Sequence, residues 1–222
     1  MKTYVATNNA GKLRELKALL AKSPLQIVTP RKRFELDVVE SAPTYAGNAL
    51  LKATALANAL RDRHLSAAVL ADDSGLEVEA LAGRPGIHSA RYGGPDLAWP
   101  ARRAGLLAEM RGVPPYRRGA RFVCALVLIA PNREPITAIG EVRGYILESE
   151  TGTGGFGYDA IFLYPPAGRS FASLSEKEKN AVSHRHNAAE ALLATLHGIA
   201  GPLLSVPSSA VSPGAEPRGE AP

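Results

Sequence analysis

The sequence has almost no cysteine and no long hydrophobic run. Its one cysteine, Cys124, cannot form an intramolecular disulfide, and its apolar neighbours favour a core position for the thiol. The longest apolar run, Val123–Ala130, is far too short to cross a bilayer. The N-terminal residues also lack the apolar segment of a signal peptide. We therefore expect a cytoplasmic protein that makes no membrane contact.

A basic stripe interleaved with aromatic residues, which is typical of nucleic-acid-binding surfaces, is also missing. The formal net charge of +5 favours anionic partners, but the arginines and lysines form short, separate clusters. Small phosphorylated ligands explain the same excess of positive charge. We expect no stable nucleic-acid complex, and a basic nucleic-acid-binding protein is the alternative outside the enzymes.

The length and composition fit a globular protein of moderate size. A chain of 222 residues with 45% hydrophobic and 21% charged residues can bury a substantial core. We expect one two-lobed domain over residues 1–200. Residues 205–222 are rich in Pro, Ser, Gly and Ala, and this composition predicts a disordered tail.

Apolar periodicity predicts alternating strands and helices in the first half of the chain and a hairpin in the second half. The first half contains the expected strands Tyr4–Ala6, Leu25–Val28 and Ala67–Leu70, and the expected helices Gly11–Lys22 and Tyr45–Arg61. The second half contains the expected strands Arg121–Ala130, Ile136–Leu147 and Ile161–Tyr164, and the expected helix Ala188–His197. This order predicts an α/β fold with a mixed sheet, flanking helices, a βαβ lobe and a hairpin-rich lobe.

The acidic segment Ala71–Gly75 follows the apolar run 67–70 directly. Asp, Ser and Gly after a buried strand predict a tight turn at the rim of a sheet. The adjacent carboxylates of Asp72 and Asp73 repel each other, and a divalent cation would offset that repulsion. From these residues alone, a cation site and a solvated turn both remain open.

A polar segment lies between the first expected strand and the first expected helix. It consists of Thr7, Asn8, Asn9, Ala10, Gly11 and Lys12. Backbone N–H groups at a helix N-terminus bind phosphate, and the lysine would add a positive charge. A Walker A pattern is absent from the whole chain. The alternative interpretation is a helix start that an asparagine caps.

The segment Gly152–Asp159 contains the pattern Gly-x-Gly-x-x-Gly. A dinucleotide-binding interpretation requires a following helix, but a strand-like run broken by two prolines follows instead. The glycines would allow a ligand to approach the backbone closely, and Phe156 or Tyr158 could stack on a base. A flexible loop remains the alternative for this segment.

The segment Lys179–Arg185 brings three basic side chains together just before the last expected helix. Lys179, His184 and Arg185 could bind phosphate or hydrogen-bond to a base edge. A solvated basic helix start is the alternative. Glu40 and Lys52 are weaker candidates for the same site.

Six motifs follow one another along the chain: Thr7–Lys12, Tyr45–Ala53, Ala71–Leu76, Gly86–Tyr92, Gly154–Asp159 and Ser183–Arg185. In these motifs and in their order, the sequence resembles the inosine triphosphate pyrophosphatase family over residues 3–198. That family hydrolyses deaminated purine nucleoside triphosphates. The departures are small: Asn8 stands where many members have glycine, and Ala160 stands where a proline often follows the aromatic loop.

The resemblance implies an elongated, two-lobed α/β fold around a long mixed sheet, a homodimer, and a substrate cleft between the lobes. It further implies Mg²⁺-dependent cleavage of ITP, dITP and XTP between the α- and β-phosphates, which keeps these nucleotides out of DNA and RNA. Asp73 would be the proton acceptor and a Mg²⁺ ligand, and Glu40 would be the second acidic ligand. A pyrophosphatase for other modified nucleotides is the alternative within this class.

The same resemblance assigns the remaining side chains to the two ends of a nucleotide. The residues expected to hold phosphates are Thr7, Asn8, Asn9, Ala10, Gly11, Lys12, Lys52 and Ser74. Those expected to surround the base are Phe156, Gly157, Tyr158, Asp159, Lys179, His184 and Arg185. Asp72 is expected to support its neighbour. A donor such as His184 or Arg185 would favour the 6-keto oxygen of the base over the amino group of adenine.

Overall fold

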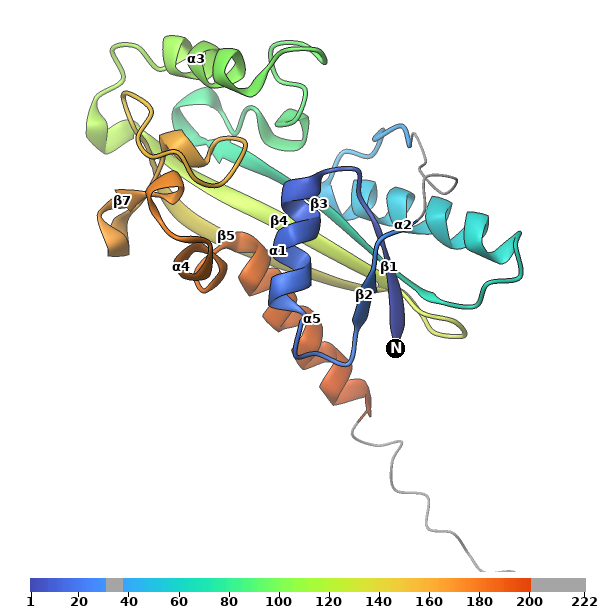
Figure 1. Ribbon diagram of the computed structural model, residues 1–222. Helices are drawn as coiled ribbons and strands as arrows, with labels where there is room; N and C mark the ends of the chain where they lie inside the picture. The colour runs from blue at the N-terminus through green and yellow to red at the C-terminus, as the bar shows by residue number, and fades with distance from the viewer. Residues whose placement is uncertain (31–37, 201–222) are drawn as a thin grey trace, which may run out of the picture.

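The computed structural model describes residues 1–30 and 38–200. Its centre is one seven-stranded mixed sheet with the order β2-β1-β3-β4-β5-β6-β7 (Figure 1). Strand β1 (Lys2–Ala6) pairs in parallel with β2 (Gln26–Val28) and with β3 (Ala68–Val78). The other pairs are antiparallel and involve β4 (Gly119–Ile129), β5 (Ile136–Ile146), β6 (Phe162–Tyr164) and β7 (Arg169–Ser170). The expected mixed α/β sheet is confirmed.

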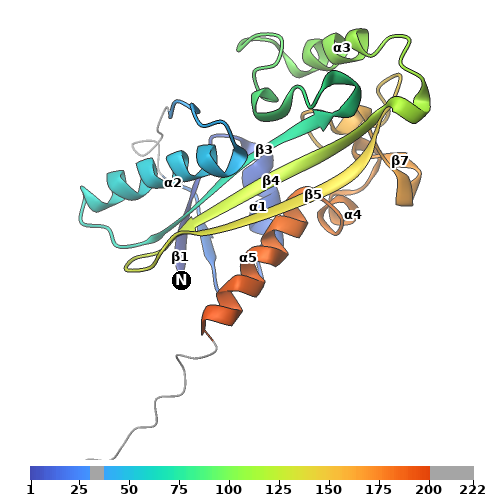
Figure 2. The same ribbon diagram turned by 180° about the vertical axis from the view of Figure 1, so that it is seen from behind.

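Helices cover both faces of this sheet (Figure 1 and Figure 2). The helices are α1 (Ala10–Leu19), α2 (Tyr45–Arg61), α3 (Trp99–Glu109), α4 (Glu176–Asn180) and α5 (His184–Ala200). Short 3₁₀ helices lie at Glu79–Leu81, Gly86–His88, Pro115–Arg117, Asp159–Ile161, Pro165–Ala167 and Phe171–Ser173. No helix within the described ranges is long and apolar enough to span a membrane.

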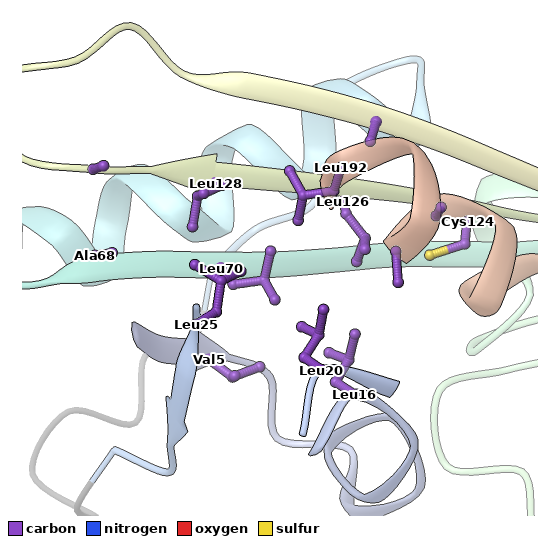
Figure 3. Packing of buried hydrophobic residues seen from close by; sticks show 14 residues of the cluster. Val5, Leu16, Leu20, Leu25, Ala68, Leu70, Cys124, Leu126, Leu128 and Leu192 are labelled. Carbon is purple, nitrogen blue, oxygen red and sulfur yellow. The ribbon is translucent and has the colours of Figure 1, made fainter. Parts of the chain in front are cut away.

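Alternation along the strands sends neighbouring side chains to opposite faces of the sheet. Leu70 and Leu126 face α1 and α5, where they pack with Leu16 and Leu192 (Figure 3). The adjacent Val69 belongs to the cluster on the α2 side of the sheet. Both faces of β3 and β4 are buried, and β4 is apolar at nearly every position, whereas β3 is interrupted by the polar residues Asp72, Asp73, Ser74 and Glu77. The sheet is therefore the middle layer between α1 and α5 on one face and α2 on the other.

The three long strands β3, β4 and β5 also form the second lobe, beneath α3 (Figure 2). In this lobe, Leu76 near the end of β3 and Phe122 near the beginning of β4 pack with Leu106 of α3. Phe162 and Phe171 complete this cluster with rings 5.0 Å apart. The strands thus join both lobes in one sheet, and a site at mid-strand lies between the lobes.

The predicted turn at Ala71–Gly75 is wrong, because β3 continues through it to Val78. Asp72 is in register with Leu126 and Gly75 with Val123, so β4 provides ladder partners along the whole segment. Cationic side chains from α1, α2 and α5 bind the two carboxylates, so the acids can stay ionised without contact with solvent. The acidic segment is therefore mid-strand.

Two of the predicted helices, Gly11–Lys22 and Ala188–His197, differ from the observed ones at both ends, and the sequence patterns do not predict α3 and α4. Helix α1 ends at Leu19 rather than Lys22, and α5 begins at His184 rather than Ala188. The earlier start of α5 has a consequence for the site, because it places His184 and Arg185 in the first helical turn. The predicted tail at 205–222 lies outside the described residues.

The close crossing of α5 over β5 depends on Gly140, because a Cβ there would collide with the backbone of His184 and Ala188. We expect Gly140→Ala to lower the free energy of unfolding by about 1–3 kcal/mol through overpacking. Gly105→Ala in α3 is the matched control, since a Cβ there meets no described atom within 4 Å. It should raise stability by about 0.5–1 kcal/mol through helix propensity. Urea denaturation measures both, and equal effects would contradict this packing.

Candidate active site

The two adjacent acids of β3 face opposite sides of the sheet. Asp72 points toward α1 and α5, where it binds Lys12 and Arg185. Asp73 points toward α2, where it binds Lys52. The strand period of two residues therefore separates the carboxylates and gives each its own set of partners.

Asp72 is fully engaged by its surroundings. Its Oδ1 accepts from Lys12 Nζ at 2.6 Å and from Ser74 Oγ at 3.0 Å, and its Oδ2 accepts from Arg185 Nε at 2.7 Å. Cys124 Sγ also donates to Oδ2 at 3.3 Å. Burial opposes ionisation, but Arg185 and Lys12 outweigh it and hold the pKa of Asp72 well below its usual range. Asp72 is thus a permanent buried anion with no lone pair directed at the cleft.

Asp73 keeps one oxygen available. Lys52 Nζ donates to its Oδ1 at 2.7 Å, whereas the buried Oδ2 has no hydrogen-bond partner among the residues that the structure describes. Burial raises the pKa of Asp73 above its usual value, and the nearby lysines only partly offset this. A carboxylate with a raised pKa and an unpartnered oxygen is suited to accept a proton or bind a cation.

Glu40 and Asp73 both bind the ammonium group of Lys52. Lys52 Nζ donates to Glu40 Oε1 at 3.1 Å as well as to Asp73, so one ammonium group joins the two carboxylates. Arg91 Nη1 donates to Glu40 Oε2 at 2.6 Å. Burial acts against ionisation, yet Lys52 and Arg91 together lower the pKa of Glu40.

These two carboxylates fit a Mg²⁺ ion. Within residues 1–30 and 38–200 no group of three or more His, Cys, Asp or Glu side chains could hold a metal. Mg²⁺ does not need such a group, because it usually takes one or two carboxylates together with water and substrate phosphate oxygens. The unpartnered, buried Oδ2 of Asp73 next to Glu40 provides this minimal set.

A chain of alternating charges leads from the acidic strand to the aromatic loop. Glu15 of α1 accepts from Arg185 Nη1 and from Lys179 Nζ, the latter at 2.8 Å, and Lys179 also binds Asp159. The chain as a whole contains three cations and three anions in strict alternation: Lys12, Asp72, Arg185, Glu15, Lys179 and Asp159. Because every buried charge has an opposite neighbour, the network can stay ionised away from water.

Glu15 belongs to none of the motifs in the sequence, although it is buried at the centre of this network. Its one local signal is its position on α1, three residues after Lys12 and next to the buried Leu16. An acid on the buried side of an amphipathic helix indicates a buried partner. That partner could not be named from the sequence.

The glycine-rich loop folds back over the start of α1. A Cβ on Gly11 would lie 2.7 Å from the ring of Phe156, so the glycine allows the ring to pack against the helix. Lys179 Nζ lies 4.7 Å from the centre of the same ring, which favours a cation–π contact. Asp159 Oδ2 accepts from the backbone N–H of Phe156 at 2.8 Å. The predicted loop is therefore ordered by specific contacts.

His184 is a buried, neutral imidazole. Its ring stacks on Phe122 with centroids 4.8 Å apart, and its Nδ1 has no partner in the described part of the chain. Burial, then the positive charges of Arg185 and Lys179, hold the pKa of His184 well below its usual range. A neutral imidazole can donate from one ring nitrogen and accept at the other.

Two connected hollows bring the predicted residues together. The first is lined by residues that include Thr7, Asn8, Asn9, Lys12, Glu40, Lys52 and Arg91. The second is lined by residues that include Asn9, Lys12, Glu40, Asp73, Ser74, Phe156, Gly157, Tyr158, Asp159, Lys179, His184 and Arg185. Asn9, Lys12, Glu40 and Ala90 line both. The result is one cleft with a basic end and an aromatic end.

Ala10 and Gly11 form the first turn of α1 and line neither hollow. Asn9 caps this helix, because its side chain accepts from the backbone N–H of Lys12 at 3.1 Å. The capping interpretation of this segment is therefore correct, and the cap also fixes the helix N-terminus at the basic end of the cleft. Arg91 is a residue of this end to which the sequence analysis gave no role.

A protein-family model covers nearly all of the described chain. The model of the Ham1 family matches residues 3–195. The chain belongs to the Ham1 family. A dITP/XTP pyrophosphatase of Geobacillus kaustophilus is 46% identical over 185 residues, which are 83% of this chain and 88% of that protein. One of Methylococcus capsulatus is 43% identical over 202 residues, which are 90% of this chain and 98% of that protein.

Solved Ham1 structures have the same fold. The Staphylococcus aureus Ham1 protein superposes with a TM-score of 0.77 at 37% identity, covering 90% of this chain and all of that one. A structure described as a nucleoside-triphosphatase, dITP/XTP pyrophosphatase, from Mycobacterium abscessus has a TM-score of 0.65 at 39% identity. It covers 87% of this chain and 99% of that one. The Ham1 fold therefore extends through both lobes.

The neutral state of His184 has a measurable effect on stability. In the unfolded chain this imidazole takes up a proton near its ordinary pKa of about 6.5, whereas the folded protein holds it neutral. Stabilisation is then complete above that value and is lost as the pH falls through it. Between pH 7.5 and 5.5 we expect the wild type to lose about 1 kcal/mol more unfolding free energy than His184→Gln.

Urea denaturation at the two pH values measures this difference. His197→Gln, at an exposed position of the same helix, is the control and should keep the wild-type pH dependence. A His184→Gln variant that loses as much stability on acidification as the wild type would contradict a neutral His184.

Proposed function

We propose that this chain hydrolyses the deaminated purine nucleoside triphosphates dITP, ITP and XTP to the monophosphate and pyrophosphate. The observation that carries the proposal is a single cleft with carboxylates and cations at one end and aromatic and neutral imidazole side chains at the other. The Ham1 relatives named dITP/XTP pyrophosphatase support it. A triphosphate matches the charged end, and a purine base matches the aromatic end.

The basic end is assigned to the triphosphate. Lys12, Lys52 and Arg91 line it beside the N-terminus of α1, where backbone N–H groups favour an anion. Glu40 and Asp73 would hold Mg²⁺, which would neutralise phosphate charge and polarise the attacked phosphorus. The lysines would stabilise the negative charge that develops on the leaving pyrophosphate.

Asp73 is assigned as the proton acceptor. Its Oδ2 is buried and unpartnered within the described residues, so it can hold the attacking water by a hydrogen bond. Burial raises the pKa of this carboxylate, which strengthens it as a base. Lys52 fixes the orientation of the group through Oδ1. Asp72, whose oxygens are all engaged, keeps the neighbouring strand and helices in place.

The aromatic end is assigned to the base. Phe156 offers a face for stacking, and His184 offers a neutral imidazole beside it. Hypoxanthine and xanthine have a 6-keto oxygen that accepts from a donor here, whereas adenine presents an amino group. Leaving a buried donor or acceptor without its hydrogen-bond partner weakens binding by about 1–3 kcal/mol. Guanine shares the 6-keto oxygen, so its exclusion requires discrimination at the 2-position.

A cytoplasmic homodimer belongs to the same proposal, on the strength of the family resemblance. On the outward face of β5, Ile139 and Tyr145 remain 60% and 42% exposed in the single chain. Glu141 and Arg143 lie between them on the same face, so the dimer rests on the family resemblance and not on an apolar patch. Light scattering should give twice the mass of one 23.4 kDa chain. A monomer at working concentration would contradict the dimer.

The activity is tested by pyrophosphate release from a panel of triphosphates with and without Mg²⁺. We expect turnover of dITP, ITP and XTP, little turnover of ATP, GTP and TTP, and none without Mg²⁺. Asp73→Asn should lower kcat by about 10²-fold or more, because it removes the proton acceptor. Equal turnover of ATP and ITP would contradict the assigned specificity.

Asp96→Asn is the matched control for this experiment. Asp96 is exposed and lies outside both hollows, so the same chemical change there should leave kcat unchanged. Full activity of Asp73→Asn would overturn the assigned mechanism. Loss of activity in both variants would show that the effect is not specific to the site.

A further inference from the structure

Arg91 is a cation of the cleft that belongs to the motif Gly86–Tyr92 but has no role assigned from the sequence. It follows the 3₁₀ turn Gly86–His88 and lines the basic hollow together with Lys12 and Lys52. Its Nη1 donates to Glu40 Oε2 at 2.6 Å, and its Nη2 donates to the Glu40 carbonyl at 3.5 Å. The side chain is 36% exposed, so the guanidinium group stands at the mouth of the site.

Both oxygens of the Glu40 carboxylate are held in ion pairs in this structure. Lys52 occupies Oε1 and Arg91 occupies Oε2, and Lys52 also binds Asp73. This group of four side chains has two positive charges, on Lys52 and Arg91, and two negative charges, on the carboxylates that they bind. The group is therefore neutral as a whole. A divalent cation arriving alone would have to displace ion pairs and would leave two uncompensated positive charges. A triphosphate arriving with the cation supplies the missing negative charge.

We propose that Arg91 binds the triphosphate of the substrate and that, in the nucleotide-free protein, its ion pair with Glu40 withholds this carboxylate from the metal. This inference rests on the proposed function and deepens it. The guanidinium fork matches phosphate oxygens as well as carboxylate oxygens, so Arg91 exchanges one anion for the other. Its move to phosphate releases Glu40 at the moment the metal is needed.

Arg91 therefore has opposite effects on two ligands measured separately. It hinders a metal that binds alone, because it occupies and neutralises Glu40. It assists a triphosphate that binds alone, because it adds a positive charge and two donors. A residue that only ties down the segment around Glu40 would have a different signature, since its loss would weaken both ligands.

The test compares the wild type with Arg91→Met, which removes the charge and keeps an unbranched side chain. The first probe is Mn²⁺ alone, with free ion counted by its electron paramagnetic resonance signal. The second is inorganic triphosphate in excess EDTA, titrated by calorimetry. We expect Mn²⁺ to bind about fivefold more tightly to Arg91→Met, and triphosphate to bind about tenfold more weakly.

Two further variants sharpen the comparison. Arg84→Met removes an arginine that pairs with the exposed Glu109 outside the cleft, so both affinities should stay within about twofold of wild type. Arg91→Lys keeps the charge and should recover part of the triphosphate affinity while keeping Mn²⁺ binding weak. Unchanged or weaker Mn²⁺ binding in Arg91→Met, or unchanged triphosphate binding, would overturn the inference.

Mn²⁺ and inorganic triphosphate contain no purine base, so the outcome does not depend on the nucleotide specificity in the proposed function. Opposite shifts in Arg91→Met, in a protein that releases no pyrophosphate from dITP or XTP, would support the role of Arg91 and overturn the proposed substrate. Normal turnover of dITP without opposite shifts would leave the proposed function standing and overturn the role of Arg91.

Discussion

The rest of the structure depends on the buried chain of alternating charges between Lys12 and Asp159. Each member is stabilised by an opposite charge, and an isolated one would be very costly away from water. The network joins the start of α1, the middle of β3, the start of α5 and the aromatic loop. One set of ion pairs therefore fixes the position of the basic end of the cleft relative to the aromatic end.

The pleat of β3 gives the two adjacent acids different tasks. Asp72 faces this network and is neutralised by Lys12 and Arg185. Asp73 faces α2, shares Lys52 with Glu40 and keeps a free oxygen. A mid-strand position also fixes both side chains more rigidly than a loop would, as a site that must orient a water molecule requires.

Local patterns predicted the mixed sheet and most of its strands and helices, because apolar alternation and helical spacing are visible within a few residues. They failed at Ala71–Gly75, where turn-forming residues continue a strand because distant cations bind the acids. Glu15 and Arg91 could not be predicted for the same reason. The partners of Glu15 are 164 and 170 residues away, at Lys179 and Arg185, and that of Arg91 is 51 residues away, at Glu40.

The division of labour between the two acids is the central claim, and the unfolding free energies of Asp72→Asn and Asp73→Asn test it most directly. Asp72→Asn leaves Lys12 and Arg185 without their shared anion, so we predict a loss of about 3 kcal/mol. Asp73→Asn removes a carboxylate whose ionisation burial already disfavours and leaves Lys52 its ion pair with Glu40, so the loss should be clearly smaller, at about 1 kcal/mol or less. Urea denaturation measures both. An Asp73→Asn variant that loses as much stability as Asp72→Asn would contradict the account.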